Sequence, residues 1–327
     1  MPQLKRIFDS PRQPSLRWLG TRPILLASLL CFPSMAQQPG QKTYGTAEEA
    51  GLALVKAAQR NDEKALLEIL GPDGKQIVSS GDESEDASDR ANFVEKYQEM
   101  HRLVKEPDGT TTLYIGAKNW PTPIPLVDMG GSWFFDTNAG KQEILCRRVG
   151  QNETSAIHLC RDLVAAQREY FTLQQNQYAK VIFSDEGKRN GLYWKAAAGE
   201  PQSPLGPLVA ADLAKGFSNQ QKGLPTPHHG YYFRILTHQG KHAPGGTKSY
   251  LVNGKMTKGF ALLAYPMEYR SSGVMTFIVF QNGAVLQKDM GRRTVALAKT
   301  MSAYNPGADW LTAENRPEDV ASRQNAQ

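Results

Sequence analysis

Four of the chain's six histidines lie between positions 228 and 242, and imidazole nitrogens are common ligands of metal ions. These residues are His228, His229, His238 and His242. His228 and His229 are adjacent, so a strand would point them to opposite faces. The group contains no H-x-x-x-H pair on a predicted helix, and no cysteine pair accompanies it. We therefore interpret these histidines as surface or strand-end residues and predict neither a metal site nor a cofactor.

Two other short segments invite comparison with catalytic motifs. The segment SSGD at residues 79–82 lacks the G-x-S-x-G pattern of a nucleophile elbow, and its Gly-Asp pair is typical of a turn. The segment GKMTKG at residues 254–259 is similar to a lysine motif of penicillin-binding enzymes, but no S-x-x-K motif precedes it in a suitable order. We find no catalytic motif, which favours a chain that is not an enzyme and leaves the question open.

The most interesting polar run spans residues 136–153. We select these candidate binding residues from it: Asp136, Glu143, Arg147, Arg148, Asn152 and Glu153. On a helix, Glu143 pairs with Arg147 and Arg148 with Asn152 at i, i+4 spacing. One interpretation is a charged cleft at a domain junction, where a small ligand would bind or be hydrolysed. The other is a salt-bridged hinge, which we favour because helical ion pairs are common and individually weak.

Aromatic and sulfur-containing side chains give two further candidates. Trp120 and Trp133 flank a proline-rich stretch and would form an aromatic groove for a ligand or an extended peptide. The alternative, which we favour, is core packing beside an edge strand blunted by proline. Cys146 and Cys160 would pair as a disulfide in an oxidising compartment, and the alternative is two buried free thiols.

The elements that position these residues begin with a helical region. Thr46 and Glu49 form a capping box at the start of a first helix, and Gly71-Pro72 ends a second. We predict a charged loop at 79–89, a helix at 90–104 and then strands up to residue 137. Helices followed by antiparallel strands indicate an α+β fold. The opening helices loosely resemble nuclear-transport-factor-2-like cone domains.

The second half reads as a long helix and a sheet. Apolar residues at helical spacing predict an amphipathic helix at 152–171, with a break or kink at Gly150. Strands are predicted at 230–240 and 258–269, and a hairpin at 272–289 has Asn282-Gly283 as its turn. A short helix near 292–304 closes the pattern. The predicted organisation is as follows: signal peptide 1–36, linker 37–45, α+β domain 46–140, second α+β domain 141–304 and polar tail 305–327.

A predicted targeting segment carries most of the net charge of the chain. Residues 1–36 combine basic residues, a short apolar run and the small-residue sequence SMA that ends at Ala36. We predict cleavage near Ala36 and a periplasmic or secreted protein without a permanent membrane span; the alternative is a retained anchor. The segment carries five basic residues and one acidic residue, so most of the +6 net charge leaves with it. Binding to nucleic acid is therefore not predicted.

Two resemblances add to this interpretation. The stretches NETSAIHLCRDLVAAQREYF, GYYFRILT and SGVMTFIVFQNGAVLQKD follow the order of type IV pilin and pseudopilin heads, which pack a helix on an antiparallel sheet. Unlike a pilin, this chain has polar residues before that helix, where the apolar filament segment would lie. The mature chain also resembles the bacterial exported domain-of-unknown-function family 2950. That similarity rests on AAQRNDEKALLEILGPDGKQIVSSGD, NWPTPIPLV, SWFFDTNAGKQEILCRRVGQNE, AQREYF, GYYFRILT and LVNGKMTKGFALLAYP.

The pattern as a whole favours an exported, two-domain α+β protein that acts by binding. The length of 327 residues suits two domains, and 40% hydrophobic content suits a folded chain. We expect a non-catalytic binding or scaffold module with an envelope protein as its partner. The alternative is a periplasmic small-ligand binder or hydrolase that uses the charged cleft at the domain junction.

Overall fold

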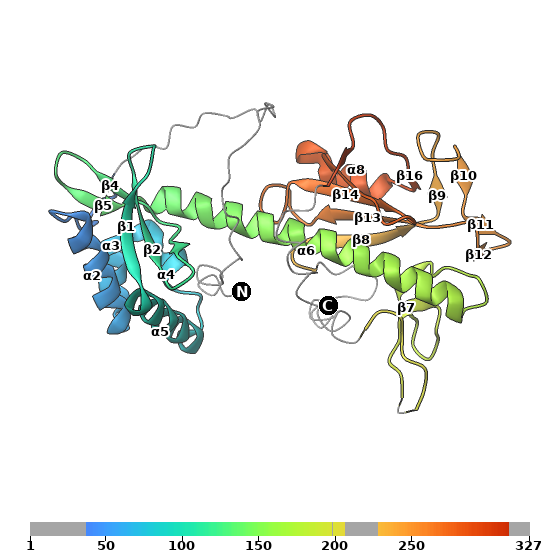
Figure 1. The fold of residues 1–327 in the computed structure, drawn as a ribbon, viewed down its shortest axis with the longest axis horizontal. Coiled ribbons are helices and arrows are strands. Elements are labelled where there is room, and N and C mark those ends of the chain that lie inside the picture. Colours follow the sequence, from blue (N-terminus) through green and yellow to red (C-terminus); the bar gives the residue numbers. More distant parts are fainter. Residues whose placement is uncertain (1–36, 198, 207–227, 314–327) are drawn as a thin grey trace. The chain divides into compact units, whose positions relative to one another are not determined.

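The computed structural model describes residues 37–197, 199–206 and 228–313, which form two compact units (Figure 1). Unit 1 holds the described residues up to Arg147, and unit 2 holds those from Arg148 onward. Helices combine with antiparallel sheets in the chain, so the predicted α+β class is confirmed. The predicted signal peptide at 1–36 lies outside the described residues. Within the described ranges, no helix has both the length and the apolar character that crossing a membrane requires.

Three helices open unit 1, and their ends follow capping signals in the sequence. They are α2 (Ala47–Gln59), α3 (Glu63–Leu70) and α4 (Lys75–Val78), with the 3-10 turn η1 (Pro72–Gly74) before α4. Thr46 Oγ1 accepts a hydrogen bond from Glu49 N at 3.1 Å, as the predicted capping box requires. Gly71 ends α3 with a φ of 78°, a conformation that favours glycine.

The next helix, α5 (Glu83–Glu99), begins inside the predicted charged loop and ends before the predicted end at residue 104. Asp82 Oδ1 accepts hydrogen bonds from the backbone N of Ser84 and of Glu85, both at 3.1 Å. An aspartate cap followed by acidic residues stabilises a helix start, so the charged run is helical. Residues 101–104 lie in a strand because pairing with a neighbouring strand overrides their helical spacing. The prediction was wrong at both ends of this helix.

Five strands of unit 1 form one antiparallel sheet (Figure 1). They are β1 (His101–Lys105), β2 (Thr111–Ile115), β3 (Trp120–Pro121), β4 (Leu126–Asp128) and β5 (Trp133–Phe135). The order is β1-β2-β4-β5, and β3 pairs with β2. Alternate residues of β2 are buried, which directs Leu113 and Ile115 into a core shared with the helices.

A single helix, α6 (Thr137–Leu173), follows β5. Asp136 Oδ1 caps its start by accepting a hydrogen bond from Ala139 N at 2.9 Å. Gly150 lies within α6, so the predicted break there was wrong. A glycine inside a helix costs only about 1 kcal/mol relative to alanine, and burial of the apolar stripe outweighs that cost. The stripe packs into the core of unit 2 through Ala156, Cys160, Leu163, Val164 and Tyr170, among others.

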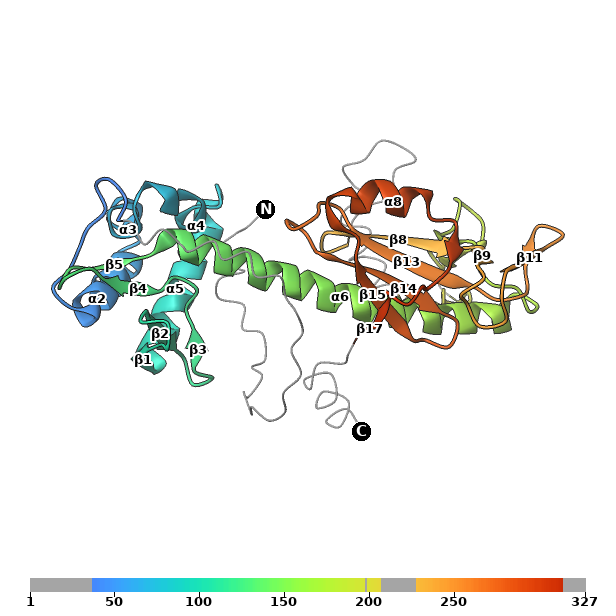
Figure 2. The same ribbon diagram turned by 90° about the horizontal axis from the view of Figure 1, so that it is seen from above.

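The main sheet of unit 2 has five antiparallel strands in the order β17-β15-β14-β13-β8. They are β8 (Tyr231–Leu236), β13 (Ala261–Pro266), β14 (Met275–Phe280), β15 (Val285–Asp289) and β17 (Leu311–Thr312). Figure 2 shows α6 and α8 (Thr294–Thr300) on opposite sides of this sheet. All six residues of β13 are buried, as expected of a strand covered on both faces. The 3-10 turn η3 (Gly291–Arg293) precedes α8.

Two details of this sheet bear on the predictions. The predicted hairpin is confirmed, because Gly283 N donates to Phe280 O at 2.8 Å in the turn between β14 and β15. Leu311 of β17 pairs with Gln287 of β15, so the sheet extends into the segment predicted as a polar tail. Backbone pairing does not need an apolar side chain, and Leu311 is 66% exposed. Residues 314–327 of that tail lie outside the described residues.

Short strands complete unit 2. They are β6 (Val181–Phe183), β7 (Gly191–Tyr193), β9 (His238–Gln239), β10 (Lys248–Ser249), β11 (Leu251–Val252), β12 (Lys255–Met256) and β16 (Ala303–Tyr304). Strands β6 and β7 pair in parallel, β11 and β12 pair antiparallel, and β9 lies between β10 and β16.

Candidate functional site

A cavity of about 70 Å³ lies in the core of unit 1. Its described lining residues come from α2, α3, α4, α5, β5 and the segment between β3 and β4: Leu54, Ala58, Leu66, Leu70, Ile77, Val78, Arg90, Phe93, Thr122, Pro123, Ile124 and Phe135. Most of these side chains are apolar and buried. An apolar wall of this kind accepts small apolar guests.

Arg90 is the only charged residue among the described residues that line this cavity. Its side chain comes from α5 and the residue is only 5% exposed. Nη1 donates to Asn61 Oδ1, and Nη2 donates to Val78 O at 2.9 Å. The buried Nε has no hydrogen-bond partner in the structure. The Nε–H of a guanidinium can only donate a hydrogen bond, and here it has no acceptor.

Thr122 supplies a second buried polar atom without a partner in the wall of the same cavity. Its Oγ1 is buried and makes no hydrogen bond, whereas its backbone N donates to Leu113 O at 2.8 Å. Pro121 and Pro123 restrict the backbone on either side. A buried donor or acceptor left unsatisfied costs about 1–3 kcal/mol. An apolar cavity with a few convergent polar groups is the usual composition of a small-molecule site.

The acidic residue one helical turn before Arg90 is already engaged. Asp86 is 2% exposed, and its carboxylate oxygens accept hydrogen bonds from Ser80 N at 3.0 and 3.1 Å. This contact ties the start of α5 to the segment that follows α4. The hydrogen bonds of the Asp86 carboxylate go to Ser80 N, and Arg90 Nε has no hydrogen-bond partner.

Three of the six candidate binding residues make contacts within unit 1. Asp136 caps α6, as described above. Glu143 Oε1 accepts a hydrogen bond from Arg147 Nε at 2.7 Å, so the predicted ion pair is present. Arg147 Nη1 also donates to Pro121 O at 2.8 Å, and its guanidinium lies 5.0 Å from the centroid of the Trp120 ring. These contacts fix the first turns of α6 to the β3 region.

The other three candidates, Arg148, Asn152 and Glu153, all bind one loop of unit 2, residues 271–275. Arg148 Nη2 donates to the carbonyl of residue 271 at 3.1 Å, and Asn152 Nδ2 donates to the carbonyl of residue 272 at 2.8 Å. Glu153 Oε1 accepts from the backbone N of residues 274 and 275 at 2.9 and 3.0 Å. The three side chains anchor this loop to α6. A binding cleft formed by all six candidates stays a prediction.

The two tryptophans pack against the core of unit 1. Trp120 is 5% exposed and belongs to that core, and the part-buried Trp133 packs beside it. The backbone of Trp133 also exchanges hydrogen bonds with Tyr44, at 2.8 and 2.9 Å. This placement agrees with core packing, and the aromatic groove stays a prediction.

The possible disulfide between Cys146 and Cys160 is contradicted, because both are free thiols on α6. Fourteen residues of helix separate the two Cα atoms by about 21 Å along the axis, whereas a disulfide needs about 4–7 Å. Cys160 is buried and Cys146 is exposed, so the alternative of two buried thiols holds only for Cys160. Burial raises the pKa of the Cys160 thiol to about 12.

Of the four clustered histidines, His228 is buried and His238 lies in β9. His229 has a φ of 44° in a turn before β8, and its ring meets the ring of His228 edge to face at 4.3 Å between centroids. We expected His228 and His229 on opposite faces of a strand. The chain turns at His229 instead, so this expectation was wrong. In the described ranges, no three His, Cys, Asp or Glu side chains group closely enough to hold a metal ion.

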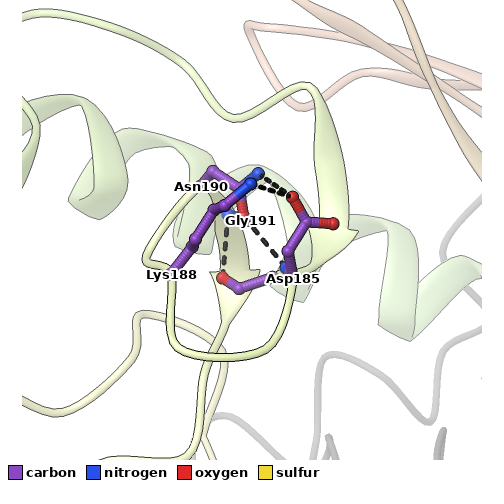
Figure 3. A network of polar contacts seen from close by, with 5 residues as sticks. Asp185, Lys188, Asn190 and Gly191 are labelled. Atoms are coloured by element: carbon purple, nitrogen blue, oxygen red, sulfur yellow. Dashed lines mark hydrogen bonds and ion pairs between the residues drawn. The ribbon is translucent and has the colours of Figure 1, made fainter.

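A hollow of about 540 Å³ in unit 2 lies beside the loop that joins β6 to β7. Figure 3 shows the polar network of this loop, in which Asp185 Oδ2 accepts from Lys188 Nζ at 3.2 Å and from Asn190 Nδ2 at 2.9 Å. Arg189 and Glu200 also form an ion pair there. These exposed charged groups pair with one another, in contrast to the buried Nε of Arg90. We therefore place the candidate site in unit 1.

Comparison with family models matches residues 41–313 to a family described as a protein of unknown function (DUF2950). The chain belongs to the DUF2950 family. The match includes every described residue that lines the cavity, so the cavity lies in the part of the chain that characterises DUF2950 proteins. Comparisons with curated proteins and with solved structures gave no match. Membership of DUF2950 confirms the family resemblance and leaves the activity to be argued from the structure.

Sequence reasoning did not select Arg90 or Thr122. One signal for Arg90 was present, because it lies three positions before Phe93 and seven before Tyr97. This spacing puts a charged residue on the apolar face of the predicted helix. Arginine is rarely buried, so an arginine on an apolar helix face is a candidate functional residue. Thr122 gave no signal, since a threonine between prolines is ordinary in an extended segment.

Proposed function

We propose that this DUF2950 protein is an exported, non-catalytic binding protein and that the cavity in unit 1 holds its ligand. The cavity and its two unsatisfied polar atoms, Arg90 Nε and Thr122 Oγ1, are the observation that carries this proposal. Export to the periplasm or beyond is supported by the basic, apolar and small-residue pattern of residues 1–36.

The chemistry of the wall supports binding rather than catalysis. The guanidinium of Arg90 has N–H donors and no acceptor atom, so it can hold a ligand only by donating hydrogen bonds. A threonine hydroxyl such as that of Thr122 needs an adjacent base to act as a nucleophile. The described lining residues include no His, Asp, Glu, Lys or Cys that would supply one. These groups can orient a bound molecule by hydrogen bonding.

The test is to express the chain with its own export segment, purify it and identify by mass spectrometry the small molecules that it carries. Ala58 of α2 is 6% exposed and lines the cavity, so Ala58→Leu places a larger side chain in the ligand's space. We expect a compound that copurifies with the wild type and is lost in Ala58→Leu. The matched control is Ala53→Leu, on the same helix but not among the lining residues, and it should retain the compound.

A second measurement covers loss of the ligand during purification. Xenon enters small apolar cavities, and it should shift the methyl resonances of Leu66 and Ile77 in the wild type but not in Ala58→Leu. If the wild type and Ala58→Leu carry the same compounds, and xenon shifts neither methyl group, the cavity is not a binding site. If Glu143→Ala or Arg147→Ala removes the compound while the xenon response persists, the ligand binds instead through the charged run at 136–153.

We further propose that unit 2 is the part that contacts an envelope protein. The packing of α6 into the core of unit 2 supports this role, which the sequence resemblance to pilin heads suggests. Cross-linking in living cells, followed by purification of the tagged mature chain, should capture one reproducible envelope partner. A chain that stays uncross-linked under conditions that cross-link known envelope complexes would oppose this role.

A further inference from the structure

The unsatisfied groups in the cavity wall restrict the chemistry of the ligand. Arg90 Nε can only donate a hydrogen bond, so the ligand must present an acceptor there. An ammonium group has no acceptor and would also meet the positive charge of Arg90. The hydroxyl of Thr122 can donate as well as accept, so an acceptor oxygen on the ligand suits it too.

Charge favours an anion over a neutral acceptor. Arg90 is buried within apolar side chains, and a hydrogen bond from a guanidinium to an anionic oxygen is about twice as strong as a neutral one. The carboxylate of Asp86 is already bonded to Ser80 N. A planar carboxylate also matches the geometry of a guanidinium better than other anions of similar size, apart from phosphate, which is too large to enter a small apolar space.

Size limits the apolar part of the ligand. The cavity measures about 70 Å³, less than half of an engineered cavity of about 150 Å³ that accepts benzene. An aromatic ring or a long acyl chain therefore exceeds the space, whereas an alkyl chain of a few carbons fits. The apolar wall, which includes Leu66, Ile77 and Ile124, suits such a chain.

We propose that unit 1 binds a short aliphatic carboxylate, with its alkyl chain in the cavity and its carboxylate oxygens accepting hydrogen bonds from Arg90 Nε and Thr122 Oγ1. This inference rests on the proposed function, because it names the ligand class of the same cavity. It also gives a hydrogen-bond partner to two buried polar atoms that make no hydrogen bond within the protein.

The experiment titrates the methyl-labelled mature chain with butyrate, 1-butanol and butylamine and follows the methyl resonances of Leu66, Ile77 and Ile124. Butyrate should shift them, 1-butanol should bind at least about tenfold more weakly, and butylamine should not bind. From acetate to butyrate, affinity should rise about fourfold for each added CH₂ group, as burial of that group predicts.

Two variants test the polar contacts. Thr122→Val removes the hydroxyl while keeping the shape of the side chain, and it should lower butyrate affinity about tenfold. The matched control is Thr276→Val, which removes a buried, unbonded hydroxyl from unit 2 and should leave butyrate affinity unchanged. Arg90→Met should make butyrate bind no better than 1-butanol. Arg90 also bonds to Asn61 and to the carbonyl of Val78, so its removal could prevent folding. Thr122→Val is then the decisive variant.

The outcomes separate the two proposals. If 1-butanol binds as tightly as butyrate, the charge of Arg90 is already balanced within the protein and the carboxylate inference is wrong, while the binding function stands. If Thr122→Val and Thr276→Val have the same effect on butyrate, the placement of the carboxylate is wrong. If none of the three compounds binds and xenon does not enter, both the ligand class and the binding function are wrong.

Discussion

The loop anchored by Glu153 offers a sharp test of whether this residue has a structural role. Glu153 Oε1 accepts hydrogen bonds from two backbone N–H groups of the loop that leads into β14, at 2.9 and 3.0 Å. Glu153→Ala leaves both donors without this partner. An unsatisfied buried donor costs about 1–3 kcal/mol, and both contacts are only part-buried, so we expect a total of about 2 kcal/mol.

This magnitude converts into a rate that can be measured locally. A loss of about 2 kcal/mol makes opening of the loop about 30 times more frequent. Hydrogen exchange with mass spectrometry should therefore show about 30-fold faster exchange in a peptide covering residues 270–280. A local measurement is preferable because a chain with two compact units need not unfold in a single step.

Two further variants complete this test. Glu153→Gln keeps an oxygen acceptor and should cost only about 1 kcal/mol, because it loses the charge but not the geometry. Glu169→Ala, an exposed position on the same helix, controls for the change in helix propensity and should leave exchange in the loop unchanged. Unchanged exchange in Glu153→Ala, or equal damage from Glu153→Gln, would refute the anchoring argument and make a ligand-binding role for this carboxylate more attractive.

Two predictions concern the cysteines and the glycine beside the same loop. In native mature protein at pH 8, a thiol reagent should label Cys146 rapidly and Cys160 only after denaturation. Burial raises the pKa of the Cys160 thiol to about 12, which keeps it protonated at that pH. Rapid labelling of both thiols in the native protein would contradict this. Gly230→Ala should destabilise unit 2 by about 2–4 kcal/mol, measured by hydrogen exchange in peptides of that unit, since Gly230 has a φ of 74° and an added Cβ would lie 2.7 Å from Ser272 Cβ. The control Gly246→Ala, with a φ of 72° and no atom within 4 Å of the added Cβ, should show the backbone strain alone.

Much of the fold could be predicted from local signals in the sequence. The capping box at Thr46, the glycine after α3 and the Asn-Gly turn each act through neighbouring residues, so their structure follows from spacing. The start of α5 was predictable in principle, because Asp82 followed by acidic residues is also a local signal. The strand at 101–104 was not, because its pairing partners lie on a strand that the helical spacing does not reveal.

The candidate site was harder to predict for the same reason. The six polar residues at 136–153 are conspicuous in sequence, yet the hydrogen bonds that involve Arg148, Asn152 and Glu153 go to one loop far along the chain. The cavity is a property of packing among four helices and a sheet, and no single segment encodes it. Only the position of Arg90 on an apolar helix face gave a local indication.

The long separation between α6 and its loop has a consequence for how the chain is made. Asn152 and Glu153 bond to residues that lie 120 to 122 positions later. A chain that emerges from its N-terminus completes the described part of unit 1 at Arg147, well before that loop exists. Long-range contacts form slowly. The apolar stripe of α6 therefore stays exposed until the strands that cover it have been made. We expect chaperones to bind newly made chains at this stripe, and unit 1 to fold first.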